Sequence, residues 1–128
     1  MPIIERFEVI EAWKKAREVT KKIHEISSVG EFGKDFGLKD QIRRSSVSVM
    51  SNIAEGFERE GNNESVNFLS IAKGSCGEAR SQLYVALDQS YISDSDFAWV
   101  YSHLNETGRM IGGFYELSET IRIEESKI

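Results

Sequence analysis

The chain has 128 residues, 40% of them apolar, and its 21 acidic and 16 basic side chains give a formal net charge of −5. This length suits one domain, and it is enough to bury a core without disulfides or structural metals. The single cysteine, Cys76, excludes an internal disulfide framework and any zinc site made of several cysteines. The apolar runs are too short for a membrane span and the first residues lack the order of a signal peptide, so we expect a cytoplasmic protein. The acidic balance disfavours a general nucleic-acid binder.

Long helices are expected because proline is absent after Pro2. The first helix is predicted over residues 7–27, where apolar side chains recur every three or four positions and charged ones occupy the opposite face. A glycine-rich loop is expected over residues 27–37. The second helix is predicted over residues 38–59, and its inward stripe is made of small and polar residues. Such a stripe lets a neighbouring helix approach closely.

The third helix is predicted over residues 63–90, and it has a similar stripe of small residues. The second helix is therefore its expected partner. Gly61 is expected to end the second helix in the left-handed conformation, and Asn62 or Asn63 to cap the third.

The fourth helix is predicted over residues 94–123. Ser93 and Asp96 resemble a capping box at its start, with Asp in place of the usual Glu. Glycines inside this helix either bend it or permit a close contact with a neighbour. They are Gly108, Gly112 and Gly113.

Short connections make consecutive helices antiparallel. We therefore predict an all-α fold, an up-down-up-down antiparallel four-helix bundle, as a single domain over residues 1–128. No internal repeat or low-complexity segment interrupts it.

The segment over residues 37–56 reads GLKDQIRRSSVSVMSNIAEG. It resembles the signature of a bacterial family of four-helix bundle proteins, which are encoded in intervening sequences of 23S rRNA genes or stand alone. QIRR at residues 41–44 and SNIAEG at residues 51–56 match that signature residue by residue, and the resemblance extends to the region of Trp13 and to residues 68–75.

The resemblance implies a homopentameric ring of bundles with no established enzymatic activity and no cofactor. A more distant relative, the accessory protein of diversity-generating retroelements, works with a reverse transcriptase and binds nucleic acid. That relative supports an RNA-related role by analogy only.

The chain departs from the family pattern at three places. Met50 stands where relatives commonly have proline, and Arg80 where they often have an acid. The loop before the second helix is rich in glycine, whereas the loop of relatives usually includes proline. The effect of Met50 on a kink in the second helix is left open.

Positive charge is concentrated in one part of the sequence. Between Lys14 and Arg44, nine bases against five acids give a local charge of +4, which leaves −9 for the remainder. Such a segment could hold phosphates through forked arginine contacts or form a subunit interface. The candidate residues are Arg43, Arg44, Lys39, Lys14 and Lys21. Alternatively, Arg43 or Arg44 pairs with Glu55 or Glu78, within the bundle or across a subunit contact, and the lysines of the first helix form an ordinary solvated face.

Four residues of the signature, Gln41, Asn52, Glu55 and Gly56, are assigned a structural role. Asn52 falls on the inward stripe, where its amide needs partners. Glu55, Ser48 or Gln82 could supply them. A role in setting helix register or in an interface is therefore preferred over catalysis.

No metal site is expected. A di-iron bundle needs glutamate three residues before histidine, but Lys21 precedes His24 and Val100 precedes His103 at that spacing. Cys76 is interpreted as a small packing residue. We therefore predict no catalytic residues, no cofactor and no small-molecule substrate.

The apolar band of the fourth helix is wider than one bundle seam requires. Large apolar surface on a protein in water usually marks an interface. Core-facing positions are expected at Met110, Phe114, Leu117 and Ile121, with Trp99, Tyr115 or Ile111 toward the flanks. Two functions remain: a homo-oligomer that binds RNA or a nucleoprotein, and a protein–protein scaffold with no nucleic acid.

Overall fold

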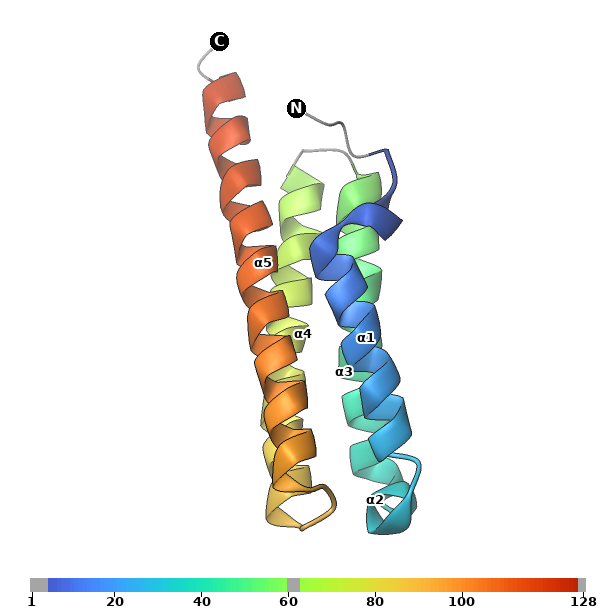
Figure 1. Cartoon of the computed structure of the whole chain (residues 1–128). Coiled ribbons are helices and arrows are strands. Elements are labelled where there is room, and N and C mark those ends of the chain that lie inside the picture. Colours follow the sequence, from blue (N-terminus) through green and yellow to red (C-terminus); the bar gives the residue numbers. More distant parts are fainter. Residues whose placement is uncertain (1–4, 60–62, 127–128) are drawn as a thin grey trace.

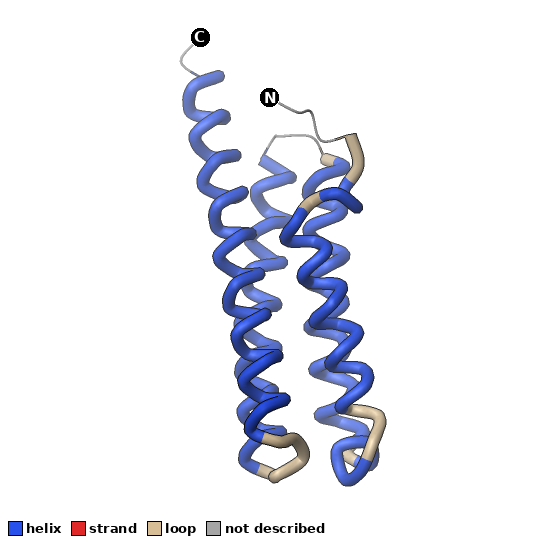
Figure 2. Tube along the Cα trace, in the orientation of Figure 1, coloured by secondary structure: helices blue, strands red, loops and turns tan. Residues whose placement is uncertain are grey.

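The computed structural model describes the backbone of residues 5–59 and 63–126, and the side chains of residues 5–59 and 64–113. Within that part, the chain is helical and contains no strand (Figures 1 and 2). The elements in chain order are the 3-10 turn η1 (Phe7–Val9), α1 (Glu11–Ile26), α2 (Gly30–Lys34), α3 (Phe36–Glu58), α4 (Asn63–Asp88) and α5 (Asp94–Ser126).

The four long helices form the antiparallel up-down-up-down bundle predicted from the sequence. Helix α1 packs against α3 and α5, and α4 packs against the same two helices. Helix α5 continues beyond the ends of α3 and α4 (Figure 1). Two ion pairs join α1 to α5, from Lys15 Nζ to Glu106 Oε2 at 3.1 Å and from Lys22 Nζ to Asp96 Oδ1 at 3.2 Å.

The predicted first helix and the loop after it are corrected by the structure. The α-helix begins at Glu11 because Ile10 has extended backbone angles, which separate it from η1. The expected loop contains α2, since the fully buried Phe32 anchors this segment to the core. Helix α3 begins two residues earlier than predicted because Asp35 Oδ1 accepts a hydrogen bond from the Leu38 N–H at 3.1 Å.

The corner around α2 is also tied to the α4–α5 turn. The ring of Phe32 stacks on Tyr91 at 5.5 Å between centroids, and the Tyr91 hydroxyl donates to Asp35 Oδ2 at 3.0 Å. That hydrogen bond raises the pKa of Tyr91. The Asp35 carboxylate therefore caps the start of α3 and also links it to the α4–α5 turn.

Other predicted helix boundaries have different outcomes. The Asp96 N–H donates to Ser93 Oγ at 3.1 Å, which confirms the Ser93 half of the capping box predicted before α5, whereas the Asp96 carboxylate pairs with Lys22. The predictions for Gly61 and Asn62 lie outside the described residues, as does that for the side chain of Asn63.

The core consists of two apolar clusters stacked along the bundle. One is centred on side chains such as Phe32, Ile42 and Leu83, and the other contains Val49 and Ile53. Ile111 is fully buried in the second cluster. Its predicted place on a flank is therefore wrong, because its face of α5 points between α1 and α4.

Several positions of the fourth helix remain as predictions. The side chains of Phe114, Tyr115, Leu117 and Ile121 lie outside those described. Met110 is partly buried against the second cluster, as its core-facing assignment predicts.

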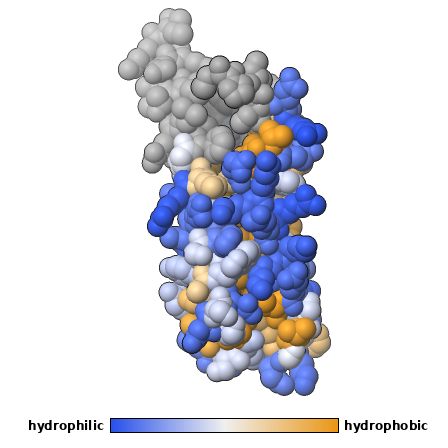
Figure 3. All heavy atoms as spheres, in the orientation of Figure 1, coloured by the Kyte–Doolittle hydropathy of each residue, from blue (hydrophilic) through white to orange (hydrophobic). Residues whose placement is uncertain are grey.

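The surface is mostly hydrophilic along the middle of the face seen in Figure 3. Apolar residues gather toward the end that carries α2 and the α4–α5 turn. None of the helices in the described part of the chain is long and apolar enough to cross a membrane.

Two glycines provide a matched test of this packing. A Cβ at Gly33 would lie 2.9 Å from the Ser28 carbonyl oxygen, whereas a Cβ at Gly74 would meet nothing within 4 Å. We expect Gly33→Ala to lower the free energy of unfolding by about 2 kcal/mol, because backbone cannot easily move aside. Gly74→Ala should raise it by about 1 kcal/mol, since alanine favours the helix interior. Urea unfolding followed by circular dichroism measures both, and equal effects would contradict the packing at α2.

Candidate nucleic-acid interface

The basic residues predicted from the sequence as candidates for nucleic-acid binding do not form one site. Lys14 and Lys21 line a shallow hollow on α1, and Lys39 and Arg43 line another at the start of α3. Arg44 lines neither of these two hollows. The +4 segment is therefore distributed over several surfaces.

Arg43 is used within the chain. Its Nε donates to Ser27 Oγ at 2.9 Å, and its Nη2 donates to Ser28 Oγ at 2.9 Å and to the His24 carbonyl oxygen at 3.3 Å. These atoms lie at the C-terminal end of α1, where helix carbonyls lack partners and a cation is favourable. Arg43 therefore caps α1 and fixes it to α3.

Within the described part of the chain, neither Arg43 nor Arg44 pairs with Glu55 or Glu78, whereas pairing across a subunit contact stays a prediction. Arg44 Nε pairs with Asp40 Oδ2 at 2.9 Å, and Glu55 pairs with Arg59 Nη2 at 2.9 Å. Asp40 precedes Arg44 by one helical turn, so this local pair was available in the sequence. Arg44 remains 80% exposed, so the pair contributes little to stability.

The three candidate lysines differ in whether they have partners within the chain. Lys14 pairs with Glu11 at 3.3 Å, and Lys39 donates to the Gly33 carbonyl oxygen at 3.0 Å. Lys21 has no ion pair with a described carboxylate.

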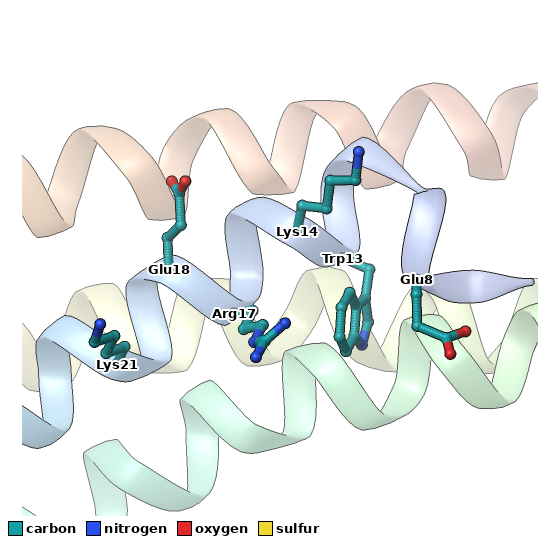
Figure 4. A pocket seen from close by; sticks show the side chains of 6 residues that line it. All are labelled: Glu8, Trp13, Lys14, Arg17, Glu18 and Lys21. Carbon is teal, nitrogen blue, oxygen red and sulfur yellow. The ribbon is translucent and has the colours of Figure 1, made fainter.

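Two carboxylates share the α1 hollow with the basic residues. In Figure 4, Lys14 and Glu18 point to one side of α1, while Arg17 and Trp13 lie near each other on another. The Arg17 guanidinium lies 5.8 Å from the centre of the Trp13 ring. Because Glu8 and Glu18 stand among the cations, this hollow has little net positive charge.

The signature residues of α3 form its contact with α4. Asn52 Nδ2 donates to Ser48 O at 2.8 Å and to Ser48 Oγ at 3.0 Å, and Ser48 Oγ in turn lies 2.8 Å from Ser75 Oγ of α4. The predicted partner Ser48 is therefore confirmed for Asn52. Gln82 instead accepts a hydrogen bond from Ser45 at 2.9 Å.

Gly56 and Gln41 both lie on α3 but differ in burial. Gly56 is buried, and a Cβ there would lie 3.3 Å from the Ser65 carbonyl oxygen of α4. Gln41 is exposed, and its carbonyl oxygen accepts from Ser45 Oγ at 3.0 Å. The close approach at Gly56 explains why the small-residue stripe pairs α3 with α4.

A different hollow, of about 440 Å³, lies between α4 and α5 and contains three basic side chains. Its lining residues are Ser70, Lys73, Gly74, Arg80, Asn105, Gly108 and Arg109. Arg80 Nη1 donates to Asn105 Oδ1 at 2.9 Å, which orients the guanidinium. Lys73 and Arg109 are exposed, and no described carboxylate lies within ion-pair distance of either.

Two glycines of α5, Gly108 and Gly112, lie close to residues of α4. A Cβ at Gly108 would lie 3.8 Å from Cys76 Cβ, and one at Gly112 would lie 3.5 Å from Lys73 Nζ. Both separations are ordinary van der Waals distances, and a Cβ at Gly113 would meet nothing within 4 Å, so the choice between a bend and a close contact stays open for these glycines.

The α4–α5 hollow could not be found by counting charges along the chain, because its basic residues come from two helices. Lys73 and Arg80 are seven residues apart, which places them on the same side of a helix, and Arg109 belongs to another helix. They fall in the part of the chain whose net charge is −9. The departure from the family pattern at Arg80 was the available signal.

The one cysteine and the two histidines lie in different settings. Burial raises the pKa of the Cys76 thiol to about 11, against a smaller lowering by the Arg80 charge, so the thiol is protonated near neutral pH. His24 and His103 each bond a carbonyl oxygen of their own helix through Nδ1, at 2.9 and 2.7 Å. In the described part of the chain, no three potential metal ligands come together.

Comparisons with known proteins agree with this fold. The model of the 23S rRNA-intervening sequence protein family matches residues 8–113. Among solved structures, one similar chain is a protein of unknown function from the S23 ribosomal protein family of Bacteroides thetaiotaomicron VPI-5482. It is 20% identical, with a TM-score of 0.74, and the match covers 81% of this chain and 97% of that one. No curated protein matches the sequence.

Adjacent arginines on α3 test the capping assignment. We expect Arg43→Ala to lower the free energy of unfolding by about 2 kcal/mol, because it removes charged hydrogen bonds to α1. Arg44→Ala should change it by less than about 0.5 kcal/mol, since it removes only an exposed pair. Chemical denaturation measures both variants, and equal losses would contradict the cap.

Proposed function

Because the chain belongs to the family of 23S rRNA-intervening sequence proteins, we propose that it is a non-enzymatic homo-oligomer, a ring of five chains, that binds RNA. The observation that carries RNA binding is the α4–α5 hollow, where Lys73, Arg80 and Arg109 stand together without a described carboxylate. Arginine and lysine contacts to phosphates supply most of the affinity of proteins for nucleic acid. The family name also connects these proteins with genes for 23S rRNA.

Exposed apolar side chains support the oligomer. Val47 on α3 is 44% exposed, and Trp99 on α5 is 36% exposed with its ring stacked on His103 at 3.7 Å. A ring is built from two different surfaces that complement each other. We place Trp99 on one surface, and Arg44 and Val47 on the surface that receives it. Arg43 is left out because it caps α1.

Two valines test this assembly. Light scattering coupled to gel filtration should give five times the 14.5 kDa chain mass at micromolar concentration. Val47→Asp should reduce that mass, because the proposed contact would bury an unpaired charge. Val29, which is 65% exposed at the start of α2, lies outside the contact, so Val29→Asp should leave the mass unchanged. A single-chain mass for the unsubstituted protein would refute the oligomer, and a dimer would refute the ring.

RNA binding is tested by its dependence on salt. The anisotropy of a labelled RNA should show binding that weakens steeply as KCl rises, since phosphate contacts release counterions. The double variant Lys73→Gln/Arg109→Gln should bind more weakly and with a smaller salt slope. Lys14→Gln/Lys21→Gln removes the same charge from α1 and should bind like the unsubstituted protein.

The alternative is a protein–protein scaffold with no nucleic acid. The net charge of −5 and the exposed apolar side chains favour it. If the protein forms the ring but binds no RNA at low salt, the scaffold replaces the proposed function.

A further inference from the structure

Three aromatic side chains, one on α4 and two on α5, form a cluster next to the α4–α5 hollow. Tyr84 lies 5.0 Å from Phe97 and 5.7 Å from Tyr101, measured between ring centroids, and Phe97 stacks on Tyr101 at 5.5 Å. Phe97 and Tyr101 are partly buried against the core, whereas Tyr84 is 48% exposed. The cluster is thus an anchored platform with one ring open to solvent.

This platform is continuous with the α4–α5 hollow. Tyr84 follows Arg80 by four residues on α4, and Tyr101 precedes Asn105 by four on α5. Residues four apart lie on the same side of a helix, and α4 and α5 are neighbours (Figure 1). A hydrogen bond with Tyr101 raises the pKa of Tyr84, and the nearby Arg80 charge acts in the opposite direction.

We call Tyr84, Tyr101, Arg80, Arg109 and Lys73 the α4–α5 strip. From Tyr84 to Lys73 it follows eleven residues of α4, or about 16 Å. We propose that the α4–α5 strip binds single-stranded RNA, with a base stacked on Tyr84 and neighbouring phosphates held by Arg80, Arg109 and Lys73. This inference rests on the proposed function and names the class of RNA.

The exposed ring is what favours a single strand over a duplex. A base can stack on a protein aromatic only when it has left its own helix, and paired strands offer phosphates and ribose hydroxyls instead. The amide oxygen of Asn105, which lines the hollow and could otherwise contact a base edge, already accepts a hydrogen bond from Arg80. We therefore expect the strip to select unpaired RNA through stacking, with only weak dependence on base sequence.

Charge also sets which part of the strip the bound strand occupies. Asp88 lies one helical turn beyond Tyr84, and Asp94 begins α5 at the same end of the bundle. These carboxylates disfavour phosphates near the α4–α5 turn. The bound strand therefore runs from Tyr84 toward Lys73.

The test compares a labelled oligouridine of about ten nucleotides, a typical site size for such proteins, with a hairpin RNA of equal length. Anisotropy titrations should show tighter binding of the oligouridine.

Tyr84→Ala should weaken that binding about tenfold without changing the salt slope, because it removes stacking but no charge. Tyr84→Phe retains a ring and should bind like the unsubstituted protein. So should Val85→Ala, which shortens the exposed side chain next to Tyr84 on α4. Lys73→Gln should reduce the salt slope by about 0.7, the value for one phosphate on a single strand.

A measurement on the unsubstituted protein guards against a folding defect in the variants. An oligouridine containing 2-aminopurine should change its fluorescence on binding, as the analogue base stacks on the tyrosine. Equal binding of hairpin and oligouridine, with Tyr84→Ala unaffected, would overturn this inference and leave the proposed function standing. No binding of either RNA at low salt would overturn both.

Discussion

The close approach of α3 and α4 is the constraint on which the rest of the bundle depends. Small side chains permit it, because a Cβ at Gly56 would already lie 3.3 Å from the Ser65 carbonyl oxygen. Hydrogen bonds cross the same contact from Ser45 to Gln82 and between Ser48 and Ser75. A partly buried polar contact of this kind is best satisfied in one register, so it fixes how α4 is placed along and around α3.

That register decides which residues α4 presents to α5. With Ala72, Ser75 and Ala79 buried toward α3 and the core, another flank of α4 carries Lys73, Arg80 and Tyr84. Helix α5 completes this surface with Asn105 and Arg109. The signature motif therefore acts on the candidate RNA site indirectly, by setting the geometry of the helix that carries it.

The sequence was sufficient for the fold and insufficient for the site, for identifiable physical reasons. Apolar periodicity depends on neighbours within one helix, so the four helices and their order could be predicted. Helix α2 could not, because it exists through the burial of Phe32 against residues distant in sequence. The role of Arg43 likewise depends on Ser27 and Ser28 of another helix. The α4–α5 strip joins residues of α4 to residues of α5 that are 17 to 36 positions away, a separation at which periodicity carries no information.

Charge has to be counted on the folded surface and not along the chain. The segment with a local charge of +4 uses Arg43 as a helix cap and Arg44 and Lys14 in ion pairs, and its Lys21 shares a hollow with Glu8 and Glu18. The remainder, at −9, contains Lys73, Arg80 and Arg109, which line one hollow with no described carboxylate among its lining residues. At physiological ionic strength, exposed charges more than about 8 Å apart are largely screened from one another. A phosphate on the strip therefore responds to Lys73, Arg80 and Arg109 more than to distant acids, and a net charge of −5 is compatible with RNA binding.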